Sequence, residues 1–170
     1  PEKSGLANMV AVMMNEGTKN RTPEELEDAI GLIGASIYVR AGNEDISISA
    51  NSLTKNFEKS ISLVEEMLLE PRWDKEQFEI AKSRIINNLK RNAASPDYLA
   101  SLTLDKHIYG NSILAYDLTA TEETVASITI EDLKDFYNNY FSPSVGRFIV
   151  AGDVDQERVE KALTAINTKW

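Results

Sequence analysis

Residues that could carry out chemistry are sparse in this chain of 170 residues. His107 is the single histidine, and there is no cysteine. One imidazole cannot assemble the usual zinc ligand set. Asp105 would point to a different helix face, so we expect no oriented triad with Ser101 or Ser112. We therefore interpret His107 as an ordinary surface or half-buried histidine.

The acidic and glycine residues also lack the spacing of known catalytic sites. The pairs Glu24-Glu25, Glu65-Glu66 and Glu122-Glu123 are adjacent in sequence and so diverge on a helix. Gly146 and Gly152 flank a strand-like stretch, but they form no G-x-G-x-x-G or G-x-x-x-x-G-K motif. The sequence therefore predicts neither a carboxylate dyad nor a nucleotide site.

Composition limits the classes of partner. Lys and Arg number 18 against 27 Asp and Glu, which gives a net charge of -9 and a pI near 4.7. This negative field repels phosphate backbones, so we expect no nucleic acid partner. No apolar stretch is long enough to predict a membrane span. A hydrophobic content of 42% suits one core, and residues 1–170 are predicted to form a single domain.

Helices are predicted throughout the chain. Gly5 to Met14 is apolar on nearly every side, which is typical of a buried helix. Thr22-Pro23-Glu24-Glu25 has the residues of a capping box and starts a second helix that ends at Gly34. Asn111 to Ala120 lacks a period and is predicted to be a loop. Further helices are expected after residues that can cap an N-terminus, namely Thr54, Asp74, Ser95, Thr121, Thr129 and Asp155.

Three strands are predicted. Ser36–Ala41 and Ile46–Ala50 alternate in polarity and form a hairpin, and Arg147–Ala151 is a third strand of nearly continuous apolar content. The predicted fold class is α+β, an antiparallel sheet with helices packed mainly on one face. Typical sheets have about four to six strands, so three strands are few for the predicted helices, and we expect a fragment of a longer chain. Exposed sheet edges could then pair with another copy.

One cluster of basic residues could be a binding patch. Lys82, Arg84, Lys90 and Arg91 gather in one predicted helix, toward its C-terminal part. Positive charge there complements the helix dipole. We interpret the cluster as a solvated face rather than a binding patch.

Several short blocks occur in the order found in one known family. The frame GLAxxxxxMxxxGT begins at Gly5, and TPEEL begins at Thr22. LxDFYxxxFSPS begins at Leu133 and is followed by xxIVAGDVD. Together these blocks span the chain and resemble the insulinase/pitrilysin family of metallopeptidases, the inverted zincins. The resemblance is to a non-catalytic domain of the kind that forms the inactive, C-terminal half of such enzymes. Domains of this family usually open with two or more strands before the GLA helix, so the resemblance implies that residues 1–170 lack the first strands.

The resemblance places the family's zinc site on residues that cannot form one. Catalytic members carry H-x-x-E-H on the first helix, with two His ligands and a Glu base. In this sequence the two His positions fall on Asn8 and Val12, and the base position falls on Ala11. The remaining Glu ligand aligns near Asn87 or Asn88. Amide and hydrocarbon side chains neither replace imidazole nor accept a proton from water, so no metal or cofactor is expected in this chain.

The resemblance implies a role beside a catalytic partner. The chain would help to enclose a chamber and bind peptide substrate, with zinc supplied by a catalytic half or subunit. By itself it would not be an enzyme, although it would form part of a zinc metalloendopeptidase. The alternative is a proteolytically dead structural or interaction domain of the same fold. An independent hydrolase is disfavoured because no nucleophile lies beside a base. Similarity to long bacterial forms favours the periplasm or cell envelope.

Overall fold

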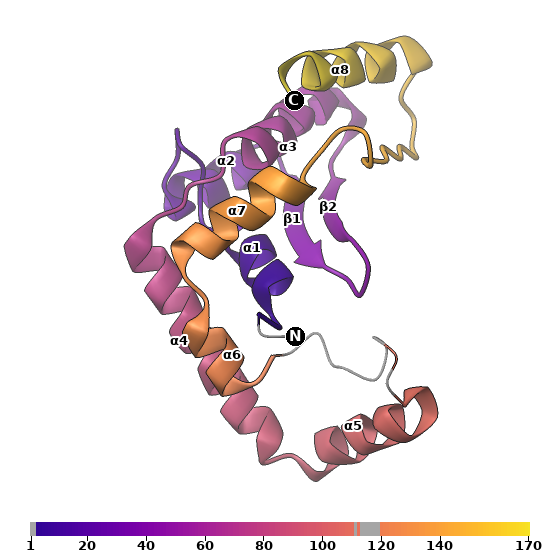
Figure 1. Cartoon of the computed structure of the whole chain (residues 1–170). Helices are drawn as coiled ribbons and strands as arrows, with labels where there is room; N and C mark the ends of the chain where they lie inside the picture. The colour runs from indigo at the N-terminus through magenta and orange to yellow at the C-terminus, as the bar shows by residue number, and fades with distance from the viewer. Residues whose placement is uncertain (1–2, 111, 113–119) are drawn as a thin grey trace. The chain divides into compact units, whose positions relative to one another are not determined.

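The structure, a computed structural model, describes residues 3–110, 112 and 120–170. It belongs to the α+β class, as predicted, and within these residues the sheet is a single antiparallel pair of strands (Figure 1). The prediction of a loop over Asn111–Ala120 falls mostly outside the described residues. In chain order the elements are α1 (Leu6–Met14), α2 (Pro23–Leu32), β1 (Ser36–Ala41), β2 (Ile46–Asn51), the 3-10 turn η1 (Thr54–Asn56), α3 (Phe57–Leu69), α4 (Lys75–Ala93), α5 (Pro96–Tyr109), α6 (Glu122–Ser127), α7 (Ile130–Tyr140) and α8 (Gln156–Lys169).

The expected N-caps position most of these helices. Thr22 accepts a hydrogen bond from the Glu25 backbone N–H, and the Glu25 carboxylate accepts one from the Thr22 N–H, which completes the predicted capping box. The side chains of Asp74, Ser95 and Asp155 also accept bonds from the first turns of α4, α5 and α8. Short polar side chains at these positions therefore fix where the helices begin.

Two compact units make up the chain. The first contains residues 1–12, 40–47 and 73–136, and the second contains residues 13–39, 48–72 and 137–170. The first unit includes α4, α5, α6 and most of α1. The second includes α2, α3 and α8. The expectation of one domain over residues 1–170 stays a prediction.

The core of the first unit forms where α4 meets the segment around α6 and α7. Lys82 of α4 donates to the carbonyl oxygen of Ile128 at 2.8 Å, and Lys90 pairs with Glu122 at 3.5 Å. Lys3 forms an ion pair with Asp132 at 2.7 Å and also donates to the Ser127 carbonyl. The buried hydrophobic residues of this unit are Met9, Val10, Ala11, Phe78, Ala81, Leu89, Ala120, Val125, Ile128 and Leu133.

The second unit is organised around α3, which buries one apolar stripe. α8 lies alongside α3 (Figure 1), where Arg158 forms two hydrogen bonds with Glu58 and Lys169 pairs with Glu65. Burial raises the pKa of Tyr137, whose hydroxyl donates to the Leu68 carbonyl at 2.5 Å. The buried hydrophobic residues are Met13, Met14, Leu26, Ile37, Val39, Phe57, Leu63, Val64, Met67, Leu68 and Ile166.

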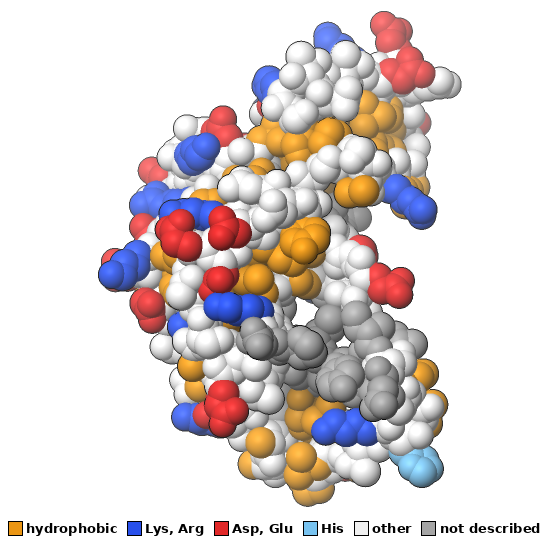
Figure 2. All heavy atoms as spheres, viewed as in Figure 1, with side chains coloured by type: hydrophobic (Ala, Val, Ile, Leu, Met, Phe, Trp, Pro, Cys, Tyr) orange, Lys and Arg blue, Asp and Glu red, His pale blue; other side chains and the backbone are white. Residues whose placement is uncertain are grey.

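The predicted strand Arg147–Ala151 is wrong. This segment has no strand assignment, and Ile149 is 87% exposed. A strand requires a hydrogen-bonded neighbour, and among the described residues the sheet contains only β1 and β2. Val145, Phe148, Ile149 and Val150 are all exposed, and Figure 2 shows hydrophobic side chains gathered beside α8.

The predicted cap at Thr54 is also wrong. Thr54 opens the 3-10 turn, and Asn56 occupies the N-cap position of α3 without a side-chain capping bond. The Asn56 amide instead donates to the Ile33 carbonyl at 2.7 Å. The side chain at the N-cap therefore makes a tertiary contact in place of a capping bond.

No helix in the described part of the chain has both the length and the apolar content of a membrane span.

Candidate functional site

The candidate site comprises the four positions that the resemblance equates with the family's zinc ligands and base. Three lie on α1 and one on α4, and all four belong to the first unit. α1 follows Gly5, which adopts a φ of +90°. A Cβ atom at Gly5 would lie 2.6 Å from the Cβ of Ala120, so only glycine fits at the start of this helix.

The three α1 positions share one side of the helix because they are spaced i, i+3 and i+4. Asn8 and Val12 are half-buried, and Ala11 is 1% exposed. The position that the resemblance equates with the family's carboxylate base therefore carries only a methyl group. Of the three side chains, only the amide of Asn8 could donate an atom to a metal, and amide oxygen is a hard ligand that suits zinc poorly beside imidazole.

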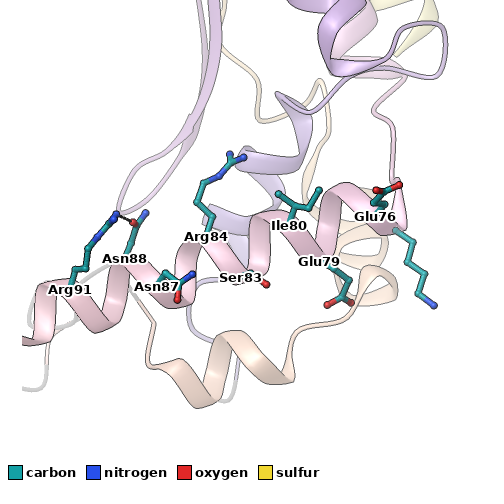
Figure 3. Close-up of a pocket in the computed structure, with 9 residues that line it drawn as sticks. Glu76, Glu79, Ile80, Ser83, Arg84, Asn87, Asn88 and Arg91 are labelled. Atoms are coloured by element: carbon teal, nitrogen blue, oxygen red, sulfur yellow. Dashed lines mark hydrogen bonds between the residues drawn. The ribbon is translucent and has the colours of Figure 1, made fainter.

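On α4, Asn88 is exposed on the outer surface of the helix, away from the buried Phe78, Ala81 and Leu89. Its side-chain oxygen already accepts a hydrogen bond from the Arg91 guanidinium, as the dashed line in Figure 3 shows. A guanidinium stays protonated throughout the physiological pH range. The one oxygen at this position therefore faces a permanent positive charge, which opposes the binding of a metal cation.

These residues do not fit zinc. Two amides and two hydrocarbon side chains supply no imidazole, no thiolate and no carboxylate, and Arg91 adds electrostatic repulsion. Across residues 3–110, 112 and 120–170, no group of three His, Cys, Asp or Glu side chains could hold a metal ion. The assignment of Asn8, Ala11, Val12 and Asn88 to the family's zinc positions stays a prediction from the sequence.

The structure does not bring His107 into a catalytic arrangement. His107 and Ser101 are both exposed on α5, six positions apart, and a helix rises about 1.5 Å per residue, so their backbones are separated by about 9 Å along the axis. Around His107 the surface is shallow and apolar, lined by Leu99, Ala100, Thr103 and Leu104. α5 buries no side chain.

The basic cluster divides into two pairs by position. Lys82 and Lys90 make the tertiary contacts described above, with Ile128 and Glu122, so they hold α6 and the segment after it against α4. Arg84 and Arg91 instead line a shallow groove along the outer side of α4 (Figure 3). Sequence reasoning missed this groove because it treated all four residues as one solvated face. We call it the α4 groove; its lining residues are Lys75, Glu76, Glu79, Ile80, Ser83, Arg84, Asn87, Asn88 and Arg91.

Charge is unevenly distributed along the α4 groove. Glu76, Glu79 and Lys75 line its N-terminal end, and Arg84 and Arg91 line its C-terminal end. Ile80, between the two, is 44% exposed. The amides of Asn87 and Asn88 add donors and acceptors that can bond a peptide backbone.

Comparison with known sequences identifies the family to which this chain belongs. A sequence model described as "Insulinase (Peptidase family M16)" matches residues 1–122. The chain belongs to this family. A second model, "Peptidase M16 inactive domain", matches residues 127–170. The resemblance inferred from the GLA and TPEEL blocks is therefore confirmed, and the two matches together extend over nearly the whole chain.

Bacterial proteins are among those with similar sequences. "Non-peptidase homolog YmxG" of Helicobacter pylori is 27% identical over 159 residues, which are 94% of this chain and 37% of that protein. "Uncharacterized zinc protease YmxG" of Bacillus subtilis is 23% identical, over 94% of this chain and 39% of that protein. This chain therefore spans well under half the length of these relatives.

Solved structures support the same fold. A protease from Helicobacter pylori superimposes with a TM-score of 0.84 at 20% identity, covering 96% of this chain and 40% of that one. The peptidase M16 inactive domain from Pseudomonas fluorescens gives a TM-score of 0.80 at 20% identity, covering 98% of this chain and 41% of that one. Together with the family models, these matches support a non-catalytic domain of the insulinase family.

Proposed function

We propose that this chain is the non-catalytic part of a zinc-dependent peptidase and that it helps to enclose the chamber and hold peptide while a partner supplies the metal. The observation that carries the proposal is the donor set at the predicted zinc positions, where Asn8, Ala11, Val12 and Asn88 provide no base and no suitable ligand set. Arg91 supports it, because a guanidinium bonded to Asn88 disfavours a cation there. The inactive-domain match over residues 127–170 supports it independently.

The partner in this proposal is a catalytic half or subunit that carries H-x-x-E-H. The experiment is to mix the chain with such a protein from the same operon or gene and to measure cleavage of an internally quenched peptide. We expect no cleavage by this chain alone and a gain in activity when both are present. A partner whose activity is unchanged by this chain would contradict the proposal, as would turnover by this chain alone.

A second candidate is a structural or interaction domain without any part in proteolysis. The description of the Helicobacter pylori relative as a non-peptidase homologue favours it. In this case the operon would lack an H-x-x-E-H protein that co-purifies with the chain. Tagged purification from the native cell, followed by mass spectrometry of the bound proteins, separates the two candidates.

We also propose that sheet edges support self-association. β1 and β2 pair with each other, and no third strand joins them among the described residues. Open edges expose backbone donors and acceptors that can pair with another chain. Sedimentation analysis over a range of concentrations tests this, and a strictly monomeric chain would contradict it. The envelope location also stays a proposal, which cell fractionation tests.

A further inference from the structure

The register of the β1–β2 hairpin determines which backbone groups face outward from the sheet (Figure 1). The Gly42 N–H donates to the Asp45 carbonyl at 2.7 Å, so these residues form a hydrogen-bonded pair that closes the loop. Hydrogen-bonded and non-hydrogen-bonded pairs alternate along an antiparallel ladder. Val39 and Ile48 therefore form a non-hydrogen-bonded pair, and the backbone N–H and C=O groups of each point away from the other strand.

The outward edge of β1 is occupied at its centre by the side chain of Asn15. The Asn15 amide nitrogen donates to the Val39 carbonyl at 2.9 Å, and the Asn15 amide oxygen accepts from the Val39 N–H at 2.9 Å. One residue of a neighbouring strand would make the same two bonds. Val39 is also only 4% exposed. A further strand therefore cannot pair with β1 at Val39 while Asn15 is in place.

The outward edge of β2 lacks this protection. Ile48 is half-buried and Ala50 is exposed, and no strand of the described residues pairs with their outward N–H and C=O groups. Ile46–Asn51 contains no charged residue and no proline, two of the features that commonly protect edge strands. Asn15, Val39, Ile48 and Ala50 all belong to the second unit. Within this sheet, β2 is therefore the edge that can accept another strand.

A second copy of β2 is complementary to this edge. We consider an antiparallel pair of β2 strands related by a twofold axis at Ile48. The facing residues are then Ile48 with Ile48, Ile46 with Ala50, Ser47 with Ser49, Asp45 with Asn51, and Glu44 with Ser52. No two like charges face each other, although acidic residues flank the strand. A twofold pairing uses the same edge on both copies, so it closes as a dimer.

We propose that two copies of this chain associate through the outward edges of β2, antiparallel about Ile48, and that Asn15 closes β1 so that assembly stops at the dimer. The Ile48 N–H of each copy donates to the Ile48 carbonyl of the other copy. Without Asn15, each copy would have two open edges, and pairing would continue from copy to copy. The inference rests on the proposed self-association through sheet edges and names the edge and its register.

Charges at positions 47 and 49 test the register, because these positions face each other across the proposed interface. Ser47→Glu with Ser49→Glu places like charges opposite each other and should weaken the dimer about tenfold. Ser47→Glu with Ser49→Lys places opposite charges there and should restore dimerisation. The two double variants differ only in the charge at position 49. Ser101→Glu with Asn87→Glu adds charge at exposed helical positions and should leave the dimer unchanged.

Sedimentation velocity over a range of concentrations measures the dimerisation constant of each variant. The net charge of -9 on each copy opposes association. Salt at roughly 0.15 M largely screens exposed charges more than about 8 Å apart, whereas facing side chains in a sheet lie closer than this. Circular dichroism verifies that each variant is folded.

Asn15→Ala tests whether this amide closes β1. The variant should form assemblies larger than a dimer, whose size rises with concentration. The Val39 N–H should also lose its protection against hydrogen exchange, because its bond to the Asn15 oxygen is removed. Asn167→Ala, at an exposed position on α8, is the matched control and should remain dimeric.

Three results would overturn the inference. They are a native chain that stays monomeric at every concentration, equal dimerisation of the two double variants, and an Asn15→Ala variant that remains a dimer. If the chain raises the activity of a catalytic partner but is monomeric alone, the edge inference is wrong and the chamber role stands. If the dimer forms through β2 and no partner is activated, the edge inference stands and the chamber role is wrong.

Discussion

Replacing Thr18 by valine tests the polar contacts that join the turn after α1 to α3. Thr18 is fully buried, and its hydroxyl oxygen accepts from the backbone N–H groups of Asn20 at 3.2 Å and Arg21 at 3.0 Å. The same hydroxyl donates to the Glu66 carboxylate. The second Glu66 oxygen lies 3.3 Å from Nε of Arg21, and the Glu66 side chain is 14% exposed. One hydroxyl therefore satisfies three partners, of which the Glu66 carboxylate has little access to water.

The expected loss of stability follows from the groups that would lose their hydrogen-bond partner in Thr18→Val. Thr18→Val keeps the shape of the side chain but leaves the Asn20 N–H and one Glu66 oxygen without their protein partner. The Arg21 N–H retains the Thr18 carbonyl at 3.3 Å. Asn20 is exposed, so its N–H can bond water, and the cost falls on the Glu66 oxygen. An unsatisfied buried group costs about 1–3 kcal/mol, so we expect a loss of about 1–3 kcal/mol in the free energy of unfolding. For a chain of this size that corresponds to a fall of roughly 3–9 °C in Tm.

Urea denaturation followed by circular dichroism measures this change. Thr18→Ser is the matched control, because it keeps the hydroxyl and removes one methyl group at a cost of about 1 kcal/mol. A Thr18→Val variant within about 0.5 kcal/mol of the native chain would refute the reasoning. So would a serine variant as unstable as the valine variant, because the loss would then come from packing.

Two further predictions concern the first unit. Hydrogen bonding to Lys3 lowers the pKa of Asp132 from 3.8 to about 2, so this carboxylate stabilises the fold above pH 3.8 and loses that contribution as the pH falls toward 2. Lys3→Gln should therefore lower the urea midpoint at pH 7 and reduce its decline between pH 4 and 2, and an unchanged decline would count against the ion pair. Gly5→Ala should destabilise the chain by about 1–3 kcal/mol, because of its φ of +90° and the 2.6 Å approach to Ala120. Gly31→Ala, in α2 with open space around it, should be neutral or stabilising by up to about 1 kcal/mol, and equal melting temperatures for the two variants would contradict this account.

Local sequence signals predicted the helices well. The capping box at Thr22 and Glu25 appears as expected, because both of its bonds form within one turn and need nothing from the rest of the chain. The predicted end of α2 at Gly34 has an equally local cause, because Gly34 adopts a φ of +60°. The hairpin of β1 and β2 was predicted for the same reason, since its two strands are joined by a short turn.

Features that depend on distant partners were predicted poorly. Arg147–Ala151 has the composition of a strand, but hydropathy does not supply the neighbouring strand that pairing requires. Lys82 and Arg84 are two residues apart in one basic cluster, yet one bonds the Ile128 carbonyl and the other lines the α4 groove. Their different roles depend on where α6 and the following segment pack, which periodicity within α4 cannot reveal.

The candidate site was predicted from residue types rather than geometry. Asn8, Ala11 and Val12 were identified by the i, i+3, i+4 spacing of a family motif, and the structure places them on one helix, α1. The bond from Arg91 to Asn88 was not foreseen, although a basic residue three positions after an amide on a helix is a signal that could have indicated it.

The central claim is that this polypeptide forms part of a peptidase fold without a metal centre of its own. The most direct measurement is the zinc content of the purified chain by plasma mass spectrometry, after incubation with excess zinc and removal of the unbound metal. We predict no stoichiometric zinc, and no change in the residual amount on Asn8→Ala. One tightly bound zinc ion per chain that is lost in Asn8→Ala or Asn88→Ala would contradict the account.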